Sequence, residues 1–170
     1  MVVMKGINDM EIEAMARLTF QKPWTIRFIE VMPMRQNPGK QVSQYVSTDT
    51  IRGRLEAIAP WTPVDTGPLA GPAAEFRYEG AIGSVGFITP LSHTFCGSCN
   101  RVRLTTAGKL RLCLFGESGC DLRGPLRAGA TVDDLRGIIL EALKLKPESH
   151  HLALGYSGPE APVTMSSIGG

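Results

Sequence analysis

The segment MVVMKGINDMEIEAMARLTFQKPWTIRFIEVM, residues 1–32, decides the fold class. Its first four residues are apolar and resemble the end of a buried strand, and residues 24–32 are rich in β-branched and other apolar side chains. Between them, Asn8 and Glu11 have the spacing of a helix capping box, and apolar residues then recur at a helical period as far as Pro23. Strand, helix and strand in this order predict a βα unit of a parallel sheet, and therefore an α/β fold.

The rest of the chain suggests two domains joined by a linker. Residues 33–46 are polar and contain proline and glycine, so we expect a loop, and residues 48–59 have the apolar spacing of a second helix. Four prolines and two glycines within residues 60–73 predict an interdomain linker. The predicted organisation is therefore 1–59 as βα units of a parallel sheet, 60–73 as the linker, and 74–170 as a second domain of short strands and a helix.

Within this second domain, two further features of secondary structure are expected. Short alternating runs at residues 76–78 and 82–88 predict a hairpin. Residues 131–146 predict a helix, because Thr131 can cap its N-terminus and Pro147 ends the periodic pattern.

Composition excludes several functional classes. Of the 170 residues, 43% are hydrophobic and 20% are charged, with a formal net charge of +2, so the overall charge does not favour nucleic acid or a polybasic membrane contact. No apolar run reaches transmembrane length, and we see no signal peptide, so the expected location is the cytoplasm. In that compartment, clustered cysteines indicate a metal or catalytic site rather than disulfides.

Four cysteines lie close together in the sequence. Cys96 and Cys99 form a C-x2-C pair, which places two thiolates on one tight turn, and Cys113 and Cys120 follow. The runs 101–105 and 109–113 alternate polar and apolar residues around Thr106-Ala107-Gly108, which predicts a hairpin with glycine in the left-handed position.

This hairpin predicts which side chains share a face. Arg103 faces Arg111 and Arg101 faces Cys113 in the expected register, so the third cysteine returns toward the C-x2-C turn beside several cations. The opposite face, Val102, Leu104, Leu110 and Leu112, is expected to pack on the core. Thiolates suit zinc or iron–sulfur clusters, and arginines suit phosphate oxygens. The cysteine pattern alone leaves an iron–sulfur site and a structural zinc site with Cys120 as fourth ligand equally open.

The run FCGSCNRVRLTTAGKLRLCLFGE, residues 95–117, resembles the radical-SAM GTP 3′,8-cyclases of molybdenum cofactor synthesis. It is similar to their C-terminal cluster motif, C-x2-C-N-R-x-R followed by a cysteine at the same spacing. Residues 5–9 (KGIND), 27–32 (RFIEVM) and 165–170 (MSSIGG) are also similar to segments of that family, in the same order. The resemblance therefore extends over the whole chain and implies the C-terminal half of such an enzyme. It implies that residues 1–59 are the last βα units of an incomplete (β/α) barrel of radical-SAM type, and that residues 74–170 are a small α+β iron–sulfur domain that binds GTP and ends in a double-glycine tail.

The resemblance implies a role for each matching residue. Cys96, Cys99 and Cys113 would ligate a [4Fe–4S] cluster whose open iron binds GTP, and Arg101, Val102 and Arg103 would line the GTP site. Met32 would contact S-adenosylmethionine, Arg27 would act near the substrate in the barrel, and Gly169 and Gly170 would reach into the active site. For the whole enzyme, the resemblance implies that a radical made from S-adenosylmethionine would take the ribose 3′-hydrogen of GTP, and that the resulting carbon radical would attack C8 of guanine.

Two departures from the family pattern affect these expectations. The family motif does not require Cys120, and the chain has no C-x3-C-x2-C motif for the cluster that cleaves S-adenosylmethionine. The S-adenosylmethionine site is therefore only partly present, and the chain alone is expected to be catalytically incomplete. The expected partners are GTP and, as an option, a second copy of the chain, with no nucleic acid or membrane.

Two other functions remain as alternatives. A structural zinc module with a basic hairpin could bind nucleic acid, although the near-neutral charge and 6% aromatic content oppose it. The C-terminal Gly169-Gly170 could instead belong to a sulfur-carrier or ubiquitin-like domain, which needs no cysteine cluster.

Overall fold

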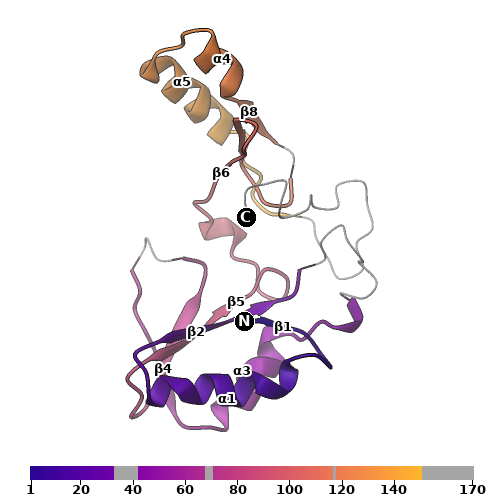
Figure 1. Ribbon diagram of the computed structural model, residues 1–170, viewed down its shortest axis with the longest axis vertical. Helices are drawn as coiled ribbons and strands as arrows, with labels where there is room; N and C mark the ends of the chain where they lie inside the picture. Colours follow the sequence, from indigo (N-terminus) through magenta and orange to yellow (C-terminus); the bar gives the residue numbers. More distant parts are fainter. Residues whose placement is uncertain (33–41, 68–70, 117, 151–170) are drawn as a thin grey trace. The chain divides into compact units, whose positions relative to one another are not determined.

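The computed structural model describes residues 1–32, 42–67, 71–116 and 118–150, which form two compact units (Figure 1). The first unit includes Met1–Met32 and extends to Phe95, and the second begins at Cys96. The predicted Pro/Gly linker at 60–73 is therefore not where the chain passes from one unit to the other. Within it, Trp61–Pro63 forms strand β3, which pairs with the hairpin that follows. Residues 74–95, which the sequence assigned to the second domain, complete the first unit.

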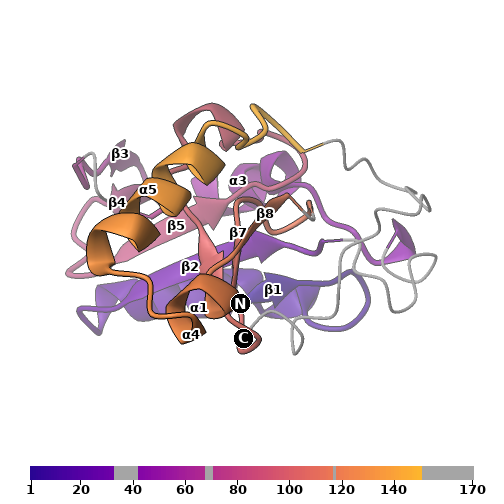
Figure 2. The same cartoon turned by 90° about the horizontal axis from the view of Figure 1, so that it is seen from above.

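The first unit is built on a five-stranded mixed sheet with strand order β1-β2-β5-β4-β3 (Figure 2). The strands are β1 (Val2–Val3), β2 (Thr25–Glu30), β3 (Trp61–Pro63), β4 (Ala74–Tyr78) and β5 (Ser84–Ile88). Strands β1, β2 and β5 are parallel, whereas β4 is antiparallel to both β5 and β3. The predicted βα unit and the predicted 76–88 hairpin are both present, and the α/β class is confirmed. An incomplete barrel stays a prediction.

Helices α1 (Ile12–Arg17) and α3 (Thr48–Glu56) cover one face of this sheet (Figure 1). Side chains alternate along a strand, so every second residue of β2 and β5 meets these helices. The core contains Ile12 and Ala16 of α1, Ile51 and Leu55 of α3, and Phe28, Val85 and Phe87 of the sheet. The other face of β2 and β5 carries Arg27 and Gly86, which are adjacent in the sheet register.

The predicted capping box at Asn8 and Glu11 is wrong. Asn8 makes no capping bond; its side chain accepts from the Met4 amide at 2.8 Å and donates to the Val2 carbonyl at 2.9 Å. Asn8 therefore ties the end of β1 to the turn that follows, and a short 3-10 helix, η1 (Asp9–Glu11), precedes α1. Asparagine favours such local backbone contacts as well as caps.

The second unit is a three-stranded sheet packed against α5 (Val132–Leu143). Its strands, in the order β6-β7-β8, are β6 (Arg103–Leu104), β7 (Lys109–Arg111) and β8 (Gly119–Asp121). The short helix α4 (Arg123–Arg127) follows β8. Thr131 caps α5 as predicted, in a complete capping box with Asp134, and its N–H···Oδ2 distance is 2.9 Å. Hydrogen bonding by Thr131 lowers the pKa of Asp134.

The predicted apolar face of the β6–β7 hairpin is only half correct. Leu110 and Leu112 are buried with Ala142 of α5, but Leu104 is 63% exposed and Val102 is 41% exposed. Strand β7 lies in the middle of the sheet, whereas β6 is an edge strand. The α5 helix packs over β7 and β8, so the outer residues of β6 receive no cover from it. No helix in the described part of the chain is long and apolar enough to cross a membrane.

Candidate site at the cysteine hairpin

The C-x2-C pair lies on one helical turn, as the sequence predicted. The 3-10 helix η3 (Cys96–Ser98) brings the amide of Cys99 to 3.0 Å from the carbonyl of Cys96. Both thiols are partly exposed and neither is in a disulfide. This turn is followed by Arg101 and then by β6, which begins at Arg103.

The predicted register of the hairpin is confirmed where the strands pair. Arg103 lies opposite Arg111 and Leu104 opposite Leu110. The turn closes with a hydrogen bond from the Thr105 amide to the Lys109 carbonyl at 2.9 Å. Gly108 has φ +76°, and a Cβ there would lie 2.6 Å from that of Arg123, so the turn requires glycine. Arg103 and Arg111 therefore share one face of the sheet.

Arg111 is not a free cation. Its Nη2 donates to the carbonyl of Gly116 at 2.5 Å, which fastens the loop after Cys113 back onto β7. Its Nε is buried and has no hydrogen-bond partner among the described residues. From the sequence, Arg111 was expected to be one of the cations available to a phosphate. In the structure, its guanidinium instead holds this loop through the hydrogen bond to Gly116.

Lys146 holds the other end of the hairpin. Its Nζ donates to the carbonyl of Arg101 at 2.9 Å and to that of Leu112 at 2.5 Å. The observed strand pairing ends at Arg103 and Arg111, so the predicted pairing of Arg101 with Cys113 is not part of the ladder. An ammonium group bridges the two strand segments at that point instead.

The three predicted ligand thiols are not gathered into one metal site. Cys96 and Cys99 share a turn before β6, and Cys113 lies two residues beyond the end of β7. Across the described ranges, no group of three or more His, Cys, Asp or Glu side chains could hold a metal ion. The chemistry of the donors suits an iron–sulfur cluster, but their arrangement does not form a closed set of ligands.

Cys120 lies on β8, the edge strand on the other side of β7 from β6. It is opposite Leu110 in the β7–β8 pairing and packs beside the small core of Leu110, Leu112 and Ala142. Burial, and secondly the charge of Asp121, raises the pKa of the Cys120 thiol. Both effects favour the protonated thiol, which is a poor metal ligand.

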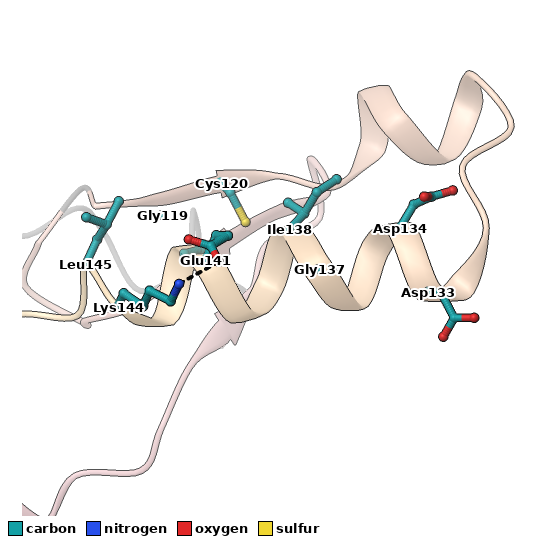
Figure 3. A pocket seen from close by; sticks show the side chains of 10 residues that line it. Gly119, Cys120, Asp133, Asp134, Gly137, Ile138, Glu141, Lys144 and Leu145 are labelled. Atoms are coloured by element: carbon teal, nitrogen blue, oxygen red, sulfur yellow. Dashed lines mark hydrogen bonds and ion pairs between the residues drawn. The ribbon is translucent and has the colours of Figure 1, made fainter.

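The Cys120 thiol opens into a groove of about 910 Å³ between β8 and α5 (Figure 3). Figure 3 shows Cys120 directed from β8 toward the helix. The lining residues are Gly119, Cys120, Asp133, Asp134, Gly137, Ile138, Glu141, Ala142, Lys144 and Leu145. Lys144 pairs with Glu141 at 2.6 Å along the same helix. Among the described residues, none of those predicted for the GTP or cluster site lines this groove.

The remaining predicted site residues are distributed as follows. Arg27 and Met32 lie in the first unit, on β2 and two residues beyond it. Arg101, Val102 and Arg103 lie in the second unit, with the cysteines. Gly169 and Gly170 lie outside the described residues.

Arg27 makes an ion pair that the sequence did not indicate. Its Nη2 lies 2.7 Å from Oε1 of Glu75, and its Nε donates to the same oxygen at 3.2 Å. Glu75 is on β4, which is 48 residues away in the chain. A long-range contact of this kind leaves no local pattern in the sequence.

A second missed residue, Glu30, anchors the segment that leads to the C-x2-C turn. Its carboxylate is fully buried and accepts from the amides of Leu91 and Ser92, both at 3.0 Å, and from the Ser92 hydroxyl. It also accepts from the Thr48 amide at 2.9 Å and the Tyr45 hydroxyl at 3.0 Å. Burial alone would raise the pKa of Glu30, but these hydrogen bonds outweigh it and lower the pKa. A charged residue within an apolar strand was the signal available from the sequence.

Comparison with known proteins adds a family match and a set of relatives. Residues 24–152 match the family model described as Molybdenum Cofactor Synthesis C. A protein of Moorella thermoacetica named GTP 3′,8-cyclase is 46% identical over 169 residues. Proteins of the same name from Pelotomaculum thermopropionicum and Heliobacterium modesticaldum are 39% and 42% identical over 170 residues. Each alignment covers 99% of this chain but only 51–52% of the relative, so the chain spans about half their length.

Proposed function

Because this chain belongs to the Molybdenum Cofactor Synthesis C family, we propose that it forms the substrate-holding part of a GTP 3′,8-cyclase. That enzyme would convert GTP to (8S)-3′,8-cyclo-7,8-dihydroguanosine 5′-triphosphate in molybdenum cofactor synthesis. The observation that carries the proposal is the hairpin at residues 96–113. Within a chain matched along its length, the hairpin joins a C-x2-C turn to the paired strands bearing Arg103 and Arg111.

We propose Arg101, Val102 and Arg103 as the residues that contact GTP. The Arg103 side chain lies on the face of β6 opposite that of the exposed Leu104, and its planar guanidinium suits bidentate binding of phosphate oxygens. Arg27 supplies a further cation in the first unit, where 52% of its side chain is exposed. Holding a substrate in the reactive geometry is a large part of catalysis, so these residues would act by positioning.

The ligands of the proposed [4Fe–4S] cluster are Cys96, Cys99 and Cys113. When bound, such a cluster with three thiolate ligands would offer one open iron to a substrate atom. Cys96 and Cys99 come from the turn at the start of the hairpin, and Cys113 would come from the segment that follows β7. We also propose that Met32 contacts S-adenosylmethionine and that Gly169 and Gly170 are active-site residues.

This chain contains no C-x3-C-x2-C motif for the cluster that cleaves S-adenosylmethionine. We therefore propose that the chain binds GTP but does not begin the radical reaction by itself. Activity would depend on the remaining part of the enzyme, which the relatives contain within their greater length.

Metal analysis of the anaerobically purified chain tests the proposal. We expect about four irons with matching sulfide per chain, lost in Cys113→Ala and retained in Cys120→Ala. A calorimetric titration should then show GTP binding that weakens in Arg103→Ala. Zinc alone, persisting after cluster reconstitution without oxygen, would overturn the iron–sulfur site and leave the structural zinc module.

A further inference from the structure

A polar network crosses three strands on the face of the first sheet opposite α1 and α3. In the register of the sheet, Arg27 of β2 and Glu75 of β4 both lie beside Gly86 of β5. The two side chains meet over this glycine, with the Arg27 Nη2 2.7 Å from the Glu75 Oε1. Two residues that are not on neighbouring strands are thereby joined by a direct ion pair.

Gly86 is what allows this contact. A Cβ at this position would lie 3.2 Å from Cγ of Arg27 and 3.3 Å from Cγ of Glu75. Distances this short would force one or both side chains to move. A residue without a side chain on the central strand therefore leaves the space through which the pair forms.

The two members of the pair have different surroundings. The Glu75 side chain is 10% exposed, and its second oxygen, Oε2, accepts from the Ser84 hydroxyl at 3.3 Å. The Ser84 hydroxyl also lies 3.0 Å from that of Thr25. The Arg27 side chain, in contrast, is 52% exposed. The carboxylate is thus held by the sheet, while the Arg27 side chain remains half exposed.

We propose that Glu75 is a positioning residue that orients the guanidinium of Arg27 for an anionic group of the substrate. This inference rests on the proposed function, in which Arg27 acts on GTP. An arginine side chain is long and flexible and loses much entropy when it binds a ligand, and a carboxylate that fixes it beforehand reduces that cost. The alternative role for Glu75 is neutralisation of Arg27, which would weaken binding of an anion rather than strengthen it.

The test is a double-mutant cycle on GTP affinity, measured calorimetrically with the full chain purified without oxygen. Its variants are Glu75→Gln, Arg27→Ala and both together. We expect Glu75→Gln to weaken GTP binding about tenfold and to have no further effect when Arg27 is already alanine. Glu13→Gln is the matched control, because it removes the carboxylate of another ion pair, with Arg54 at 2.6 Å, on the helical side of the unit. It should leave GTP affinity unchanged.

The exchange rate of the Arg27 Nε proton, measured by ¹⁵N NMR, reports positioning without any ligand. We expect slow exchange in the wild-type chain and in Glu13→Gln, and faster exchange in Glu75→Gln. Unchanged exchange, unchanged GTP affinity or tighter binding in Glu75→Gln would each overturn the inference. Failure of the wild-type chain to bind GTP would overturn the proposed function, and it would be seen before any variant is compared. The Arg27 exchange would then still decide whether Glu75 holds the guanidinium.

Discussion

Lys146 donates a hydrogen bond of 2.9 Å to the backbone carbonyl of Arg101, 45 residues earlier in the chain. A second hydrogen bond from the same ammonium reaches the Leu112 carbonyl at 2.5 Å. The segment after α5 therefore joins the two strand segments that carry the C-x2-C turn and Cys113. The Lys146 side chain therefore connects the two segments just beyond the point where the backbone pairing of β6 with β7 ends.

Replacing this lysine should loosen the hairpin. Lys146→Met keeps the length of the side chain but removes both hydrogen bonds, which leaves two carbonyl acceptors without a charged donor. We expect a loss of about 2 kcal/mol in the stability of the second unit. Amide hydrogen exchange at Leu110 and Leu112 is the appropriate measurement. Trp24 and Trp61 both lie in the first unit, so tryptophan fluorescence would not report on the second.

Lys144→Met is the matched control for this change. Lys144 also lies at the end of α5, but its ion pair with Glu141 is exposed, with 68% and 72% of the two side chains accessible. Exposed pairs of this kind contribute little, so we expect a change within about 0.5 kcal/mol. Equal effects of the two substitutions would show that charge at the helix end, rather than the bridge to Arg101, stabilises this unit.

The buried carboxylate of Glu30 should make the first unit sensitive to acid. Its hydrogen bonds hold the pKa below the usual value of 4.5 despite burial. A carboxyl group whose pKa is lower in the folded state contributes stability above its unfolded pKa, and this contribution is lost as the pH falls through the folded pKa. Urea unfolding followed by tryptophan fluorescence should therefore show stability falling below about pH 4.5.

Glu30→Gln should remove part of this pH dependence and lower stability near pH 7 by about 3 kcal/mol. The amide of glutamine places a donor where Glu30 accepts from the Ser92 and Leu91 amides. The variant should also lower the pKa of Tyr45, which is raised to about 12 by burial first and by the charge of Glu30 second. A pH profile identical to that of the wild-type chain would show that other carboxyl groups, such as Glu13 beside Arg54, cause the acid sensitivity.

Local patterns in the sequence were sufficient to predict several structural elements. Thr131 indicated the start of a helix, because its side chain caps the backbone amide three residues later. Gly108 indicated a hairpin turn, because glycine favours the left-handed conformation that the turn requires. The same turn fixed Arg103 opposite Arg111, because loop length sets the register of a hairpin. These predictions required no knowledge of distant parts of the chain.

Long-range pairing explains most of what the sequence did not show. The parallel pairing of β2 with β5 aligns Arg27 with Gly86, yet no local periodicity relates residues so far apart. The prolines at 60–73 therefore suggested a domain boundary, although Trp61 pairs with Tyr78 within the first sheet. The exposure of Leu104 likewise depends on where α5 lies. The alternation of polar and apolar residues along β6 does not indicate which strands that helix covers.

Cys120 should behave as a packed thiol rather than as a ligand. Because burial and Asp121 raise its pKa, the folded chain should react with iodoacetamide at Cys120 more slowly than the unfolded chain at the same pH. Peptide mass spectrometry after timed alkylation measures this rate. Cys120→Ala should cost about 1 kcal/mol or slightly more through lost packing with Leu110 and Leu122. Rapid alkylation in the folded chain would contradict its packing beneath α5.

Alanine substitutions at two glycines of the second unit should have opposite effects on its stability. A Cβ at Gly119 would lie 1.9 Å from the carbonyl oxygen of Leu110, which is backbone of the neighbouring strand and cannot move aside without breaking the β7–β8 pairing. At Gly137, within α5, a Cβ would meet no atom of the described residues within 4 Å. Alanine there removes the entropic cost of a helical glycine, so Gly137→Ala should stabilise the unit by about 0.5–1 kcal/mol.

Gly119→Ala should instead destabilise the unit by more than about 2 kcal/mol. Hydrogen exchange should then accelerate at Leu110 and Leu112, whereas Gly137→Ala should slow it at the same amides. The Leu112 amide is informative because it donates to the Ser118 carbonyl at 3.1 Å, next to the substituted position. If Gly119→Ala left exchange at Leu112 unchanged, the close approach of β8 to Leu110 would not exist in solution. The packing of Cys120 between β7 and α5, which depends on that approach, would then need to be abandoned as well.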